Sequence, residues 1–115
     1  MSTVNIRRIY EEPSASEGYK VLVDRLWPRG IKKEKAGIDV WLKEAGPSNE
    51  LRKWFNHEVD KWPEFSKKYK EELKANPVFK ELKKIVKEHK TVTLLYSAKD
   101  EEHNQAVVLR NLLKS

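Results

Sequence analysis

The feature that most constrains this chain is a short apolar run, Val21-Leu22-Val23, that stops abruptly in polar sequence. An unbroken run of β-branched and aliphatic residues is typical of a strand buried on both faces of a sheet. The residues that follow combine charge, a tryptophan, a proline and a glycine: Asp24-Arg25-Leu26-Trp27-Pro28-Arg29-Gly30. Ligands of open α/β sheets bind beyond such strand ends, so this segment is the first place to expect a functional site.

Two further strands are predicted, a loosely alternating one over Val4 to Tyr10 and a clear one over Thr91 to Tyr96. Between them, apolar residues recur at helical spacing behind start signals at Ser48 and Pro63, and again after a break at Asn76-Pro77. This order of strands and helices predicts one domain spanning the whole chain, 1–115. We expect a small three-layer α/β unit whose short, mostly parallel sheet is flanked by helices.

Several finer features complete the predicted fold. Ser14 and Glu17 have the spacing of a capping box, enough for about one helical turn. Asp39 is predicted to cap a short helix over residues 40–42, and the acidic residues 100–102 to open the last helix. The pairing direction of the first two strands stays open, because their link is short for a parallel crossover. The tryptophans expected in the core are those at helical apolar positions: Trp41, Trp54 and Trp62.

Composition excludes several classes of function. The chain of 115 residues has no cysteine, which excludes disulfides, thiolate metal sites and cysteine nucleophiles. Its three histidines are scattered, and no glycine-rich phosphate-binding or dinucleotide fingerprint is present, so neither a metal nor a cofactor is predicted. No apolar run is long enough to span a membrane. The first residues lack the apolar stretch of a signal peptide, which favours a cytoplasmic location.

The net charge of +6, from 24 basic and 18 acidic side chains, invites a nucleic-acid interpretation. The distribution of charge weakens it, because lysines and glutamates alternate between residues 67 and 90 as on a solvated helix face. Enrichment in both residue types is also a tendency of hyperthermophile proteins. The basic residues that remain for a nucleic acid lie in the loop 29–35: Arg29, Lys32, Lys33 and Lys35.

Two polar segments, 24–30 and 97–104, each follow a predicted strand. If those strands run parallel, as a right-handed helical crossover implies, both segments emerge at one sheet edge and face one crevice. Asp24 and His103 are the candidate catalytic residues, because a carboxylate and an imidazole serve as base and acid near neutral pH. Guanidinium and ammonium groups would hold an anion, and the tryptophan would wall the site. The candidate ligand-binding residues are Arg25, Trp27, Arg29, Lys99, Asp100 and Asn104.

Each of these residues also has a purely structural interpretation. Asp24 and Arg25 would then pair with neighbouring groups, and Asp100 would cap a helix. Trp27 would be a packed lid over the sheet rather than a pocket wall.

The chain resembles the DUF488 family, specifically its short YeaO-like branch. The residues that carry the resemblance span nearly the whole chain: 21–30, 41–43, 47–48, 51–55 with His57, 94–100 and 102–109. The resemblance implies a compact Rossmann-like α/β domain and brings no assigned activity with it. Larger relatives carry a Cys-His-Arg-like segment after the last strand, where this chain has Glu102-His103-Asn104, so their thiol chemistry does not transfer.

The leading hypothesis is a small anionic ligand bound in the crevice at the carboxyl ends of the strands, by a binding domain or an enzyme of unassigned reaction. The alternative is a nucleic-acid-binding module that uses the basic loop 29–35. A third reading is a protein-interaction domain without catalysis. Fold alone does not choose among them.

Overall fold

A parallel sheet forms the centre of the molecule, seen in a computed structural model that describes residues 3–12 and 16–114. In this part of the chain four strands lie in the order β1-β4-β2-β3, all parallel. The strands are β1 (Thr3–Arg8), β2 (Tyr19–Leu22), β3 (Val40–Trp41) and β4 (Thr91–Tyr96). The α-helices are α1 (Asn49–Phe55), α2 (Trp62–Lys74), α3 (Pro77–Glu88) and α4 (Gln105–Lys114). Three 3-10 turns complete the set: η1 (Lys33–Lys35), η2 (Lys43–Ala45) and η3 (Val59–Lys61). The predicted Rossmann-like α/β class with a parallel sheet is confirmed.

The last strand in the sequence, β4, lies in the middle of the sheet between β1 and β2. All its residues after Thr91 are buried, which explains why its sequence gave the clearest strand pattern. The first two strands do not pair with each other, because each pairs in parallel with β4. Gly18 permits the close approach where β2 begins. Its φ is +69°, and a Cβ there would lie 2.8 Å from the Cβ of Thr91.

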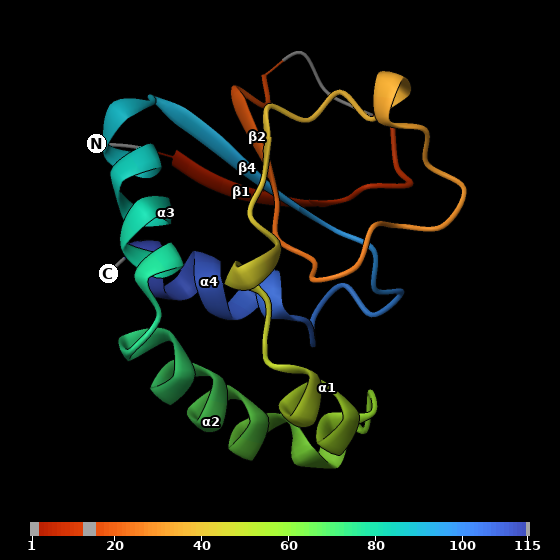
Figure 1. Ribbon diagram of the computed structural model, residues 1–115, viewed down its shortest axis with the longest axis vertical. Coiled ribbons are helices and arrows are strands. Elements are labelled where there is room, and N and C mark those ends of the chain that lie inside the picture. The colour runs from red at the N-terminus through yellow and green to blue at the C-terminus, as the bar shows by residue number, and fades with distance from the viewer. Residues whose placement is uncertain (1–2, 13–15, 115) are drawn as a thin grey trace.

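The two faces of the sheet are covered differently (Figure 1). One face packs against the α-helices through the larger apolar cluster, which includes Val92, Leu94 and Tyr96 of β4. The other face carries a smaller cluster built on Leu22 and Leu95. The side chains that close this smaller cluster come from the loop between β2 and β3 and from β3 itself: Trp27, Ile31, Ile38 and Trp41. The layers are therefore helices, sheet and an ordered loop layer, with the short η1 turn inside the loop.

The helix predicted over residues 40–42 is wrong, because Val40 and Trp41 form the edge strand β3. Asp39 does not cap a helix. Its amide donates to Lys20 O at 2.8 Å, and its carboxylate accepts from Lys20 N at 2.8 Å. The unpaired edge of β2 offers backbone hydrogen bonds that a short isolated helix cannot match, and a β-branched residue with a tryptophan suits a strand.

The helix starts were predicted with mixed success. Ser48 caps α1 as expected, with its hydroxyl accepting from Leu51 N at 3.1 Å. The polar loop predicted over 97–104 ends where α4 begins, at Gln105, but the acidic residues 100–102 lie within this loop and not at the start of the helix, where they were predicted. Asp100 instead closes a turn of its own, and Asn104 takes the capping position before α4 by accepting from Val107 N at 3.2 Å. The capping box predicted at Ser14 lies partly outside the described residues.

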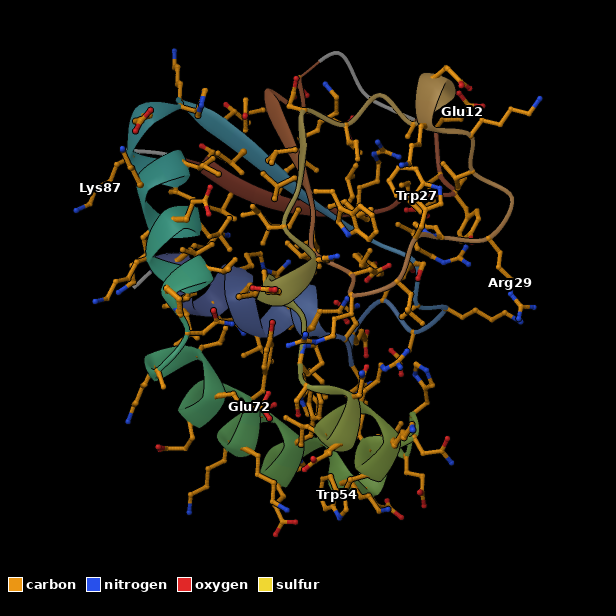
Figure 2. All side chains as sticks on the ribbon, viewed as in Figure 1. Glu12, Trp27, Arg29, Trp54, Glu72 and Lys87 are labelled. Carbon is orange, nitrogen blue, oxygen red and sulfur yellow. The ribbon has the colours of Figure 1, made fainter. Side chains whose placement is uncertain are left out.

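The tryptophans predicted for the core pack against it without being fully buried: Trp41, Trp54 and Trp62. Trp54 lies at the surface of α1, where Figure 2 shows it at the rim of the molecule. Its ring contacts the Nζ atoms of Lys68 at 4.1 Å and Lys61 at 5.0 Å. Two other apolar residues of α1, Leu51 and Phe55, are the ones buried in the core. None of the helices in the described part of the chain is long and apolar enough to cross a membrane.

Candidate functional site

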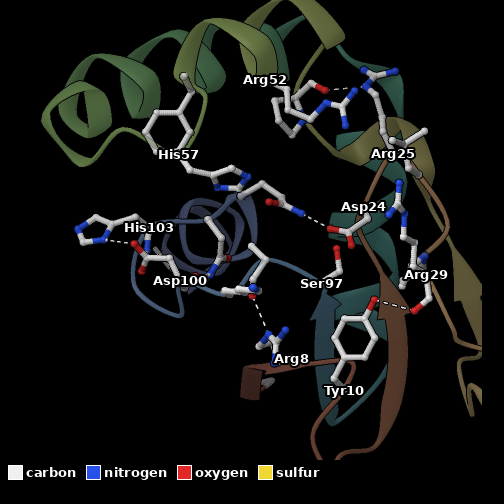
Figure 3. Close-up of a pocket in the computed structure, with 18 of the residues that line it drawn as sticks. Arg8, Tyr10, Asp24, Arg25, Arg29, Arg52, His57, Ser97, Asp100 and His103 are labelled. Carbon is white, nitrogen blue, oxygen red and sulfur yellow. Dashed lines mark hydrogen bonds and ion pairs between the residues drawn. The ribbon is translucent and has the colours of Figure 1, made fainter.

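A pocket of about 770 Å³ lies beside the carboxyl ends of β1, β2 and β4, where parallel strands bring their following loops to one edge. Figure 3 shows residues from the loop after β2 on one side and residues from the loop after β4 on the other. The pocket brings together all eight residues proposed from the sequence: Asp24, Arg25, Trp27, Arg29, Lys99, Asp100, His103 and Asn104. The structure thus places them in one site. Their roles in binding or catalysis stay predictions.

Asp24 forms a buried part of the pocket wall, with 8 % of its surface exposed. One carboxylate oxygen, Oδ1, accepts a hydrogen bond from Gln105 Nε2. The other, Oδ2, has almost no exposed surface, and the hydroxyl and backbone of Ser97 also hydrogen-bond to the carboxylate. Burial raises the pKa of Asp24 above its ordinary value, and the neighbouring Ser97, Gln105 and the charge of Arg52 oppose the shift.

Arg25 and Trp27 hold the loop after β2 in place. The guanidinium of Arg25 donates to Pro47 O at 2.6 Å and to Gly46 O at 3.3 Å, which ties the end of β2 to the start of α1. The indole of Trp27 donates to Ile31 O at 2.6 Å, and its ring meets that of Trp41 edge-on at 5.2 Å. Both side chains are half-buried. For these two residues the structural interpretation explains most of the contacts.

Arg29 and Lys99 are exposed residues of the pocket lining. Neither side chain makes a hydrogen bond or an ion pair with any residue that the structure describes. The backbone of Arg29 is anchored, because the Tyr10 hydroxyl donates to its carbonyl oxygen at 2.9 Å. The charged groups of these two side chains are therefore unpaired among the described residues, in the loops that follow β2 and β4.

The loop after β4 is held by its own polar groups. The Oδ1 atom of Asp100 accepts from Glu102 N at 2.9 Å and from His103 N at 3.0 Å, and its Oδ2 contacts His103 Nδ1 at 2.9 Å. Asn104 is buried, and its side chain donates to Asp100 O at 2.9 Å. The hydrogen bond from Glu102 N is the main cause that lowers the pKa of Asp100, and the contact with His103 adds to it. Residues 100–104 therefore form a turn closed by its own hydrogen bonds, and Lys99 lies just before it with a free side chain.

The predicted proton-transfer pair, Asp24 and His103, shares the pocket but makes no hydrogen bond with each other among the described residues. The carboxylate beside His103 is that of Asp100 instead. The imidazole also meets the ring of Trp62 edge-on at 5.2 Å. The side chain of His103 is thus held on two sides, by Asp100 and by Trp62.

Sequence reasoning missed several lining residues: Arg8, Tyr10, Arg52, His57, Ser97 and Gln105. Arg8 is the last residue of β1 and Tyr10 follows it, so the rule that singled out the other two strand ends would have found them once β1 was known to be parallel. Arg52 and His57 come from α1 and the residues after it, and no sequence signal points to them. Asn56 and His57 have φ values of 45° and 56°, a left-handed pair that is uncommon outside glycine.

The pocket is basic and partly apolar. Its basic side chains outnumber the acidic ones, which are only Asp24 and Asp100; the basic ones are Arg8, Arg25, Arg29, Arg52 and Lys99. Its apolar lining is supplied by Leu26, Trp27, Pro28, Pro47, Phe55, Phe65 and Ala98. In the described part of the chain, no cluster of three or more histidine, aspartate or glutamate side chains is placed to hold a metal ion. The arrangement suits an organic anion.

Fold and pocket together define a small parallel α/β domain with a basic pocket at the carboxyl edge of its sheet. The chain belongs to the DUF488 family, since the family model described as "Inactive DUF488-N3 subclade" matches residues 3–115.

Similar proteins span almost the same length. The chain is 45% identical over 113 residues to "Uncharacterized protein YeaO" of Escherichia coli (strain K12), which covers 97% of both chains. It is 36% identical over 110 residues to "Uncharacterized protein Rv3073c" of Mycobacterium tuberculosis (strain ATCC 25618 / H37Rv), covering 96% of this chain and 92% of the relative. No solved structure gives a significant match.

Proposed function

We propose that this protein binds a small organic anion in the pocket at the carboxyl edge of its sheet. The observation that carries the proposal is a set of pocket cations that form no ion pair with the residues that the structure describes. Arg29 and Lys99 have free side chains, and Arg52 donates only to Asn49 Oδ1, at 3.2 Å, among the described residues. Exposed cations on a protein surface are usually compensated or scattered, whereas these three line one concave site.

Binding without catalysis is the form of this proposal that we favour. The subclade to which the chain belongs is described as inactive. The residues proposed as acid and base are not in contact with each other, and His103 is engaged by Asp100. Five basic side chains around a pocket of this size match the recognition of a carboxylate or phosphate group by charge-assisted hydrogen bonds.

The test is a thermal-unfolding titration with inorganic phosphate and a panel of organic carboxylates and phosphates. A ligand that binds only the folded state raises Tm with increasing concentration. The variant that removes the pocket cations is Arg29→Ala with Arg52→Ala. The matched control, Lys80→Ala with Lys87→Ala, removes the same charge from exposed positions of α3. Figure 2 shows Arg29 and Lys87 at opposite edges of the molecule.

We expect the wild type and the α3 control to gain the same Tm increase, and the pocket variant to gain little or none. All four residues are exposed, so their removal should change the free energy of unfolding by no more than about 0.5 kcal/mol. An equal Tm increase in all three proteins would show that binding is not at the pocket.

The nucleic-acid alternative is separated by an oligonucleotide titration at two salt concentrations. It predicts a steep loss of affinity with salt and with Lys32→Glu plus Lys33→Glu. In the structure Lys33 Nζ lies 5.8 Å from the centre of the Trp27 ring, so this lysine already has an aromatic partner. Oligonucleotide binding that depends on these lysines, with no small-anion effect, would replace the proposal.

A further inference from the structure

The pocket exposes apolar side chains as well as cations. Among the residues that the structure describes, three large hydrophobic side chains are exposed: Leu26 at 60 %, Val59 at 51 % and Tyr10 at 43 % of their surface. Two of the three, Leu26 and Tyr10, line the pocket. A single exposed apolar residue is ordinary on a protein surface, whereas two in one concave site indicate a surface that binds something.

Tyr10 is held in its exposed position by contacts on two sides. Its hydroxyl donates to Arg29 O at 2.9 Å, drawn as a dashed line in Figure 3, and the guanidinium carbon of Arg8 lies 4.9 Å from the centre of its ring. The backbone just before it is fixed as well, because Ile9 N donates to Tyr96 O at 2.8 Å. The ring therefore has a set place in the pocket lining, next to the residue that supplies an unpaired cation.

Leu26 is held by its two neighbours in the chain. The guanidinium of Arg25 donates to Pro47 O at 2.6 Å, and the indole of Trp27 donates to Ile31 O at 2.6 Å. The leucine between these two anchored residues packs into neither of the two apolar clusters of the core. Its apolar surface is therefore kept at the pocket and is not used by the fold.

Charged and apolar surfaces thus lie side by side in one site. An inorganic ion would contact the cations and leave Tyr10 and Leu26 in water, whereas an organic anion would cover both kinds of surface. We propose that the ligand is amphipathic, with an anionic head group held at Arg29 and an apolar body, the size of a phenyl ring or a short alkyl chain, packed on Tyr10 and Leu26. This inference rests on the proposed anion-binding function and names the chemical class of the ligand.

The experiment compares anions that share a head group and differ in the size of the apolar body, by calorimetric titration in the same buffer. The pairs are phenyl phosphate with methyl phosphate, and hexanoate with acetate. In at least one pair the larger member should bind the wild type about tenfold more tightly or better, because it removes more apolar surface from water. The quantity measured is the ratio of the two dissociation constants within a pair.

The variant Leu26→Ser removes apolar surface from the pocket lining and should lower this ratio about threefold or more. The matched control is Val59→Ser, which makes the same kind of change at an exposed apolar residue of η3 outside the pocket lining. The control should leave the ratio unchanged. A second variant, Tyr10→Ala, should also lower the ratio, whereas Tyr10→Phe, which keeps the ring, should retain it.

The outcomes separate this inference from the function on which it rests. Equal binding of both members of each pair, still lost on removal of Arg29 and Arg52, would overturn the amphipathic ligand and keep the anion site. Binding of neither member of either pair would count against both. A ratio unchanged in Leu26→Ser and Tyr10→Ala, or lowered as much in Val59→Ser, would show that these two residues do not hold the apolar body. The ratio is first measured on the wild type, so the test does not depend on the variants folding.

Discussion

The loops after β2 and β4 lie on opposite sides of one pocket, and each carries an aspartate, yet the two aspartates have opposite surroundings (Figure 3). Asp100 accepts hydrogen bonds from Glu102 N and His103 N and contacts the His103 ring, and these contacts lower its pKa. Asp24 is buried, and burial raises its pKa although Ser97 and Gln105 hydrogen-bond to its carboxylate. The surroundings of Asp100 therefore favour the charged carboxylate, whereas those of Asp24 disfavour it. Residue type at a strand end does not reveal this difference, because it depends on burial and on the number of hydrogen-bond donors nearby.

The loops after β2 and β4 also differ in the kind of contact that holds each of them in place. The loop after β2 depends on aromatic contacts, so Trp27→Ala should have the largest effect on stability. Loss of the ring contact with Trp41 and of the hydrogen bond to Ile31 O should lower the free energy of unfolding by about 3 kcal/mol. Chemical denaturation measures this change. A loss below about 0.5 kcal/mol, the range of neutral surface substitutions, would show that the loop layer over the sheet is not anchored by Trp27.

The loop after β4 depends on hydrogen bonds, so Asn104→Ala should have the next largest effect. The substitution removes the bond to Asp100 O and the bond from Val107 N that caps α4. We expect a loss of about 1.5 kcal/mol in the free energy of unfolding, typical of a helix cap in a buried setting. The same denaturation series measures it. An effect larger than that of Trp27→Ala would reverse the ranking that the two loops imply.

The smallest expected effect is a difference in pH dependence between Asp24→Asn and Asp100→Asn. Because the pKa of Asp24 is raised in the folded state, the folded protein binds more protons above the ordinary value of 3.8, and stability falls as pH rises through that window. The pKa of Asp100 is lowered, so its contribution is present above 3.8 and is lost as pH falls below it.

Relative to wild type, Asp24→Asn should therefore be the more stable protein near neutral pH, with the advantage disappearing on acidification. Asp100→Asn should be the less stable one near neutral pH, and its deficit should disappear on acidification. Unfolding curves at a series of pH values measure both differences. Parallel pH profiles for the two variants would contradict the opposite surroundings assigned to these aspartates.

Much of the fold was accessible from the sequence because local signals and tertiary structure agree. The buried run in β4, the cap at Ser48 and the proline in the first turn of α2 are local patterns, and each is found where predicted. Asn76-Pro77 was predicted as a break between two helices, and it lies where α2 has ended and α3 begins. β3 was mistaken for a helix because two residues carry almost no periodicity, and only the free edge of β2 makes them a strand. Trp54 was placed in the core because the spacing of apolar residues does not show which end of a helical stripe faces solvent.

The sequence predicted residues of the candidate site only at the ends of those strands whose direction in the sheet could be inferred. The ends of β2 and β4 were recognised, and the pocket contains every residue named from them. Arg8 was missed because the direction of β1 was open, and Arg52 because a helix surface arginine has no distinguishing sequence context. The burial of Asp24 is a property of its three-dimensional surroundings, so no linear pattern contains it.

The central claim is that the free cations of the pocket hold an anion, and the most direct measurement is a titration of the isotope-labelled protein with inorganic phosphate, followed by amide NMR shifts. The account predicts saturable shifts that map to Arg29, Arg52 and residues 97–100, and that are absent in the variant lacking Arg29 and Arg52. Shifts confined to the lysines of α3, or no saturable shifts in the pocket at all, would contradict it.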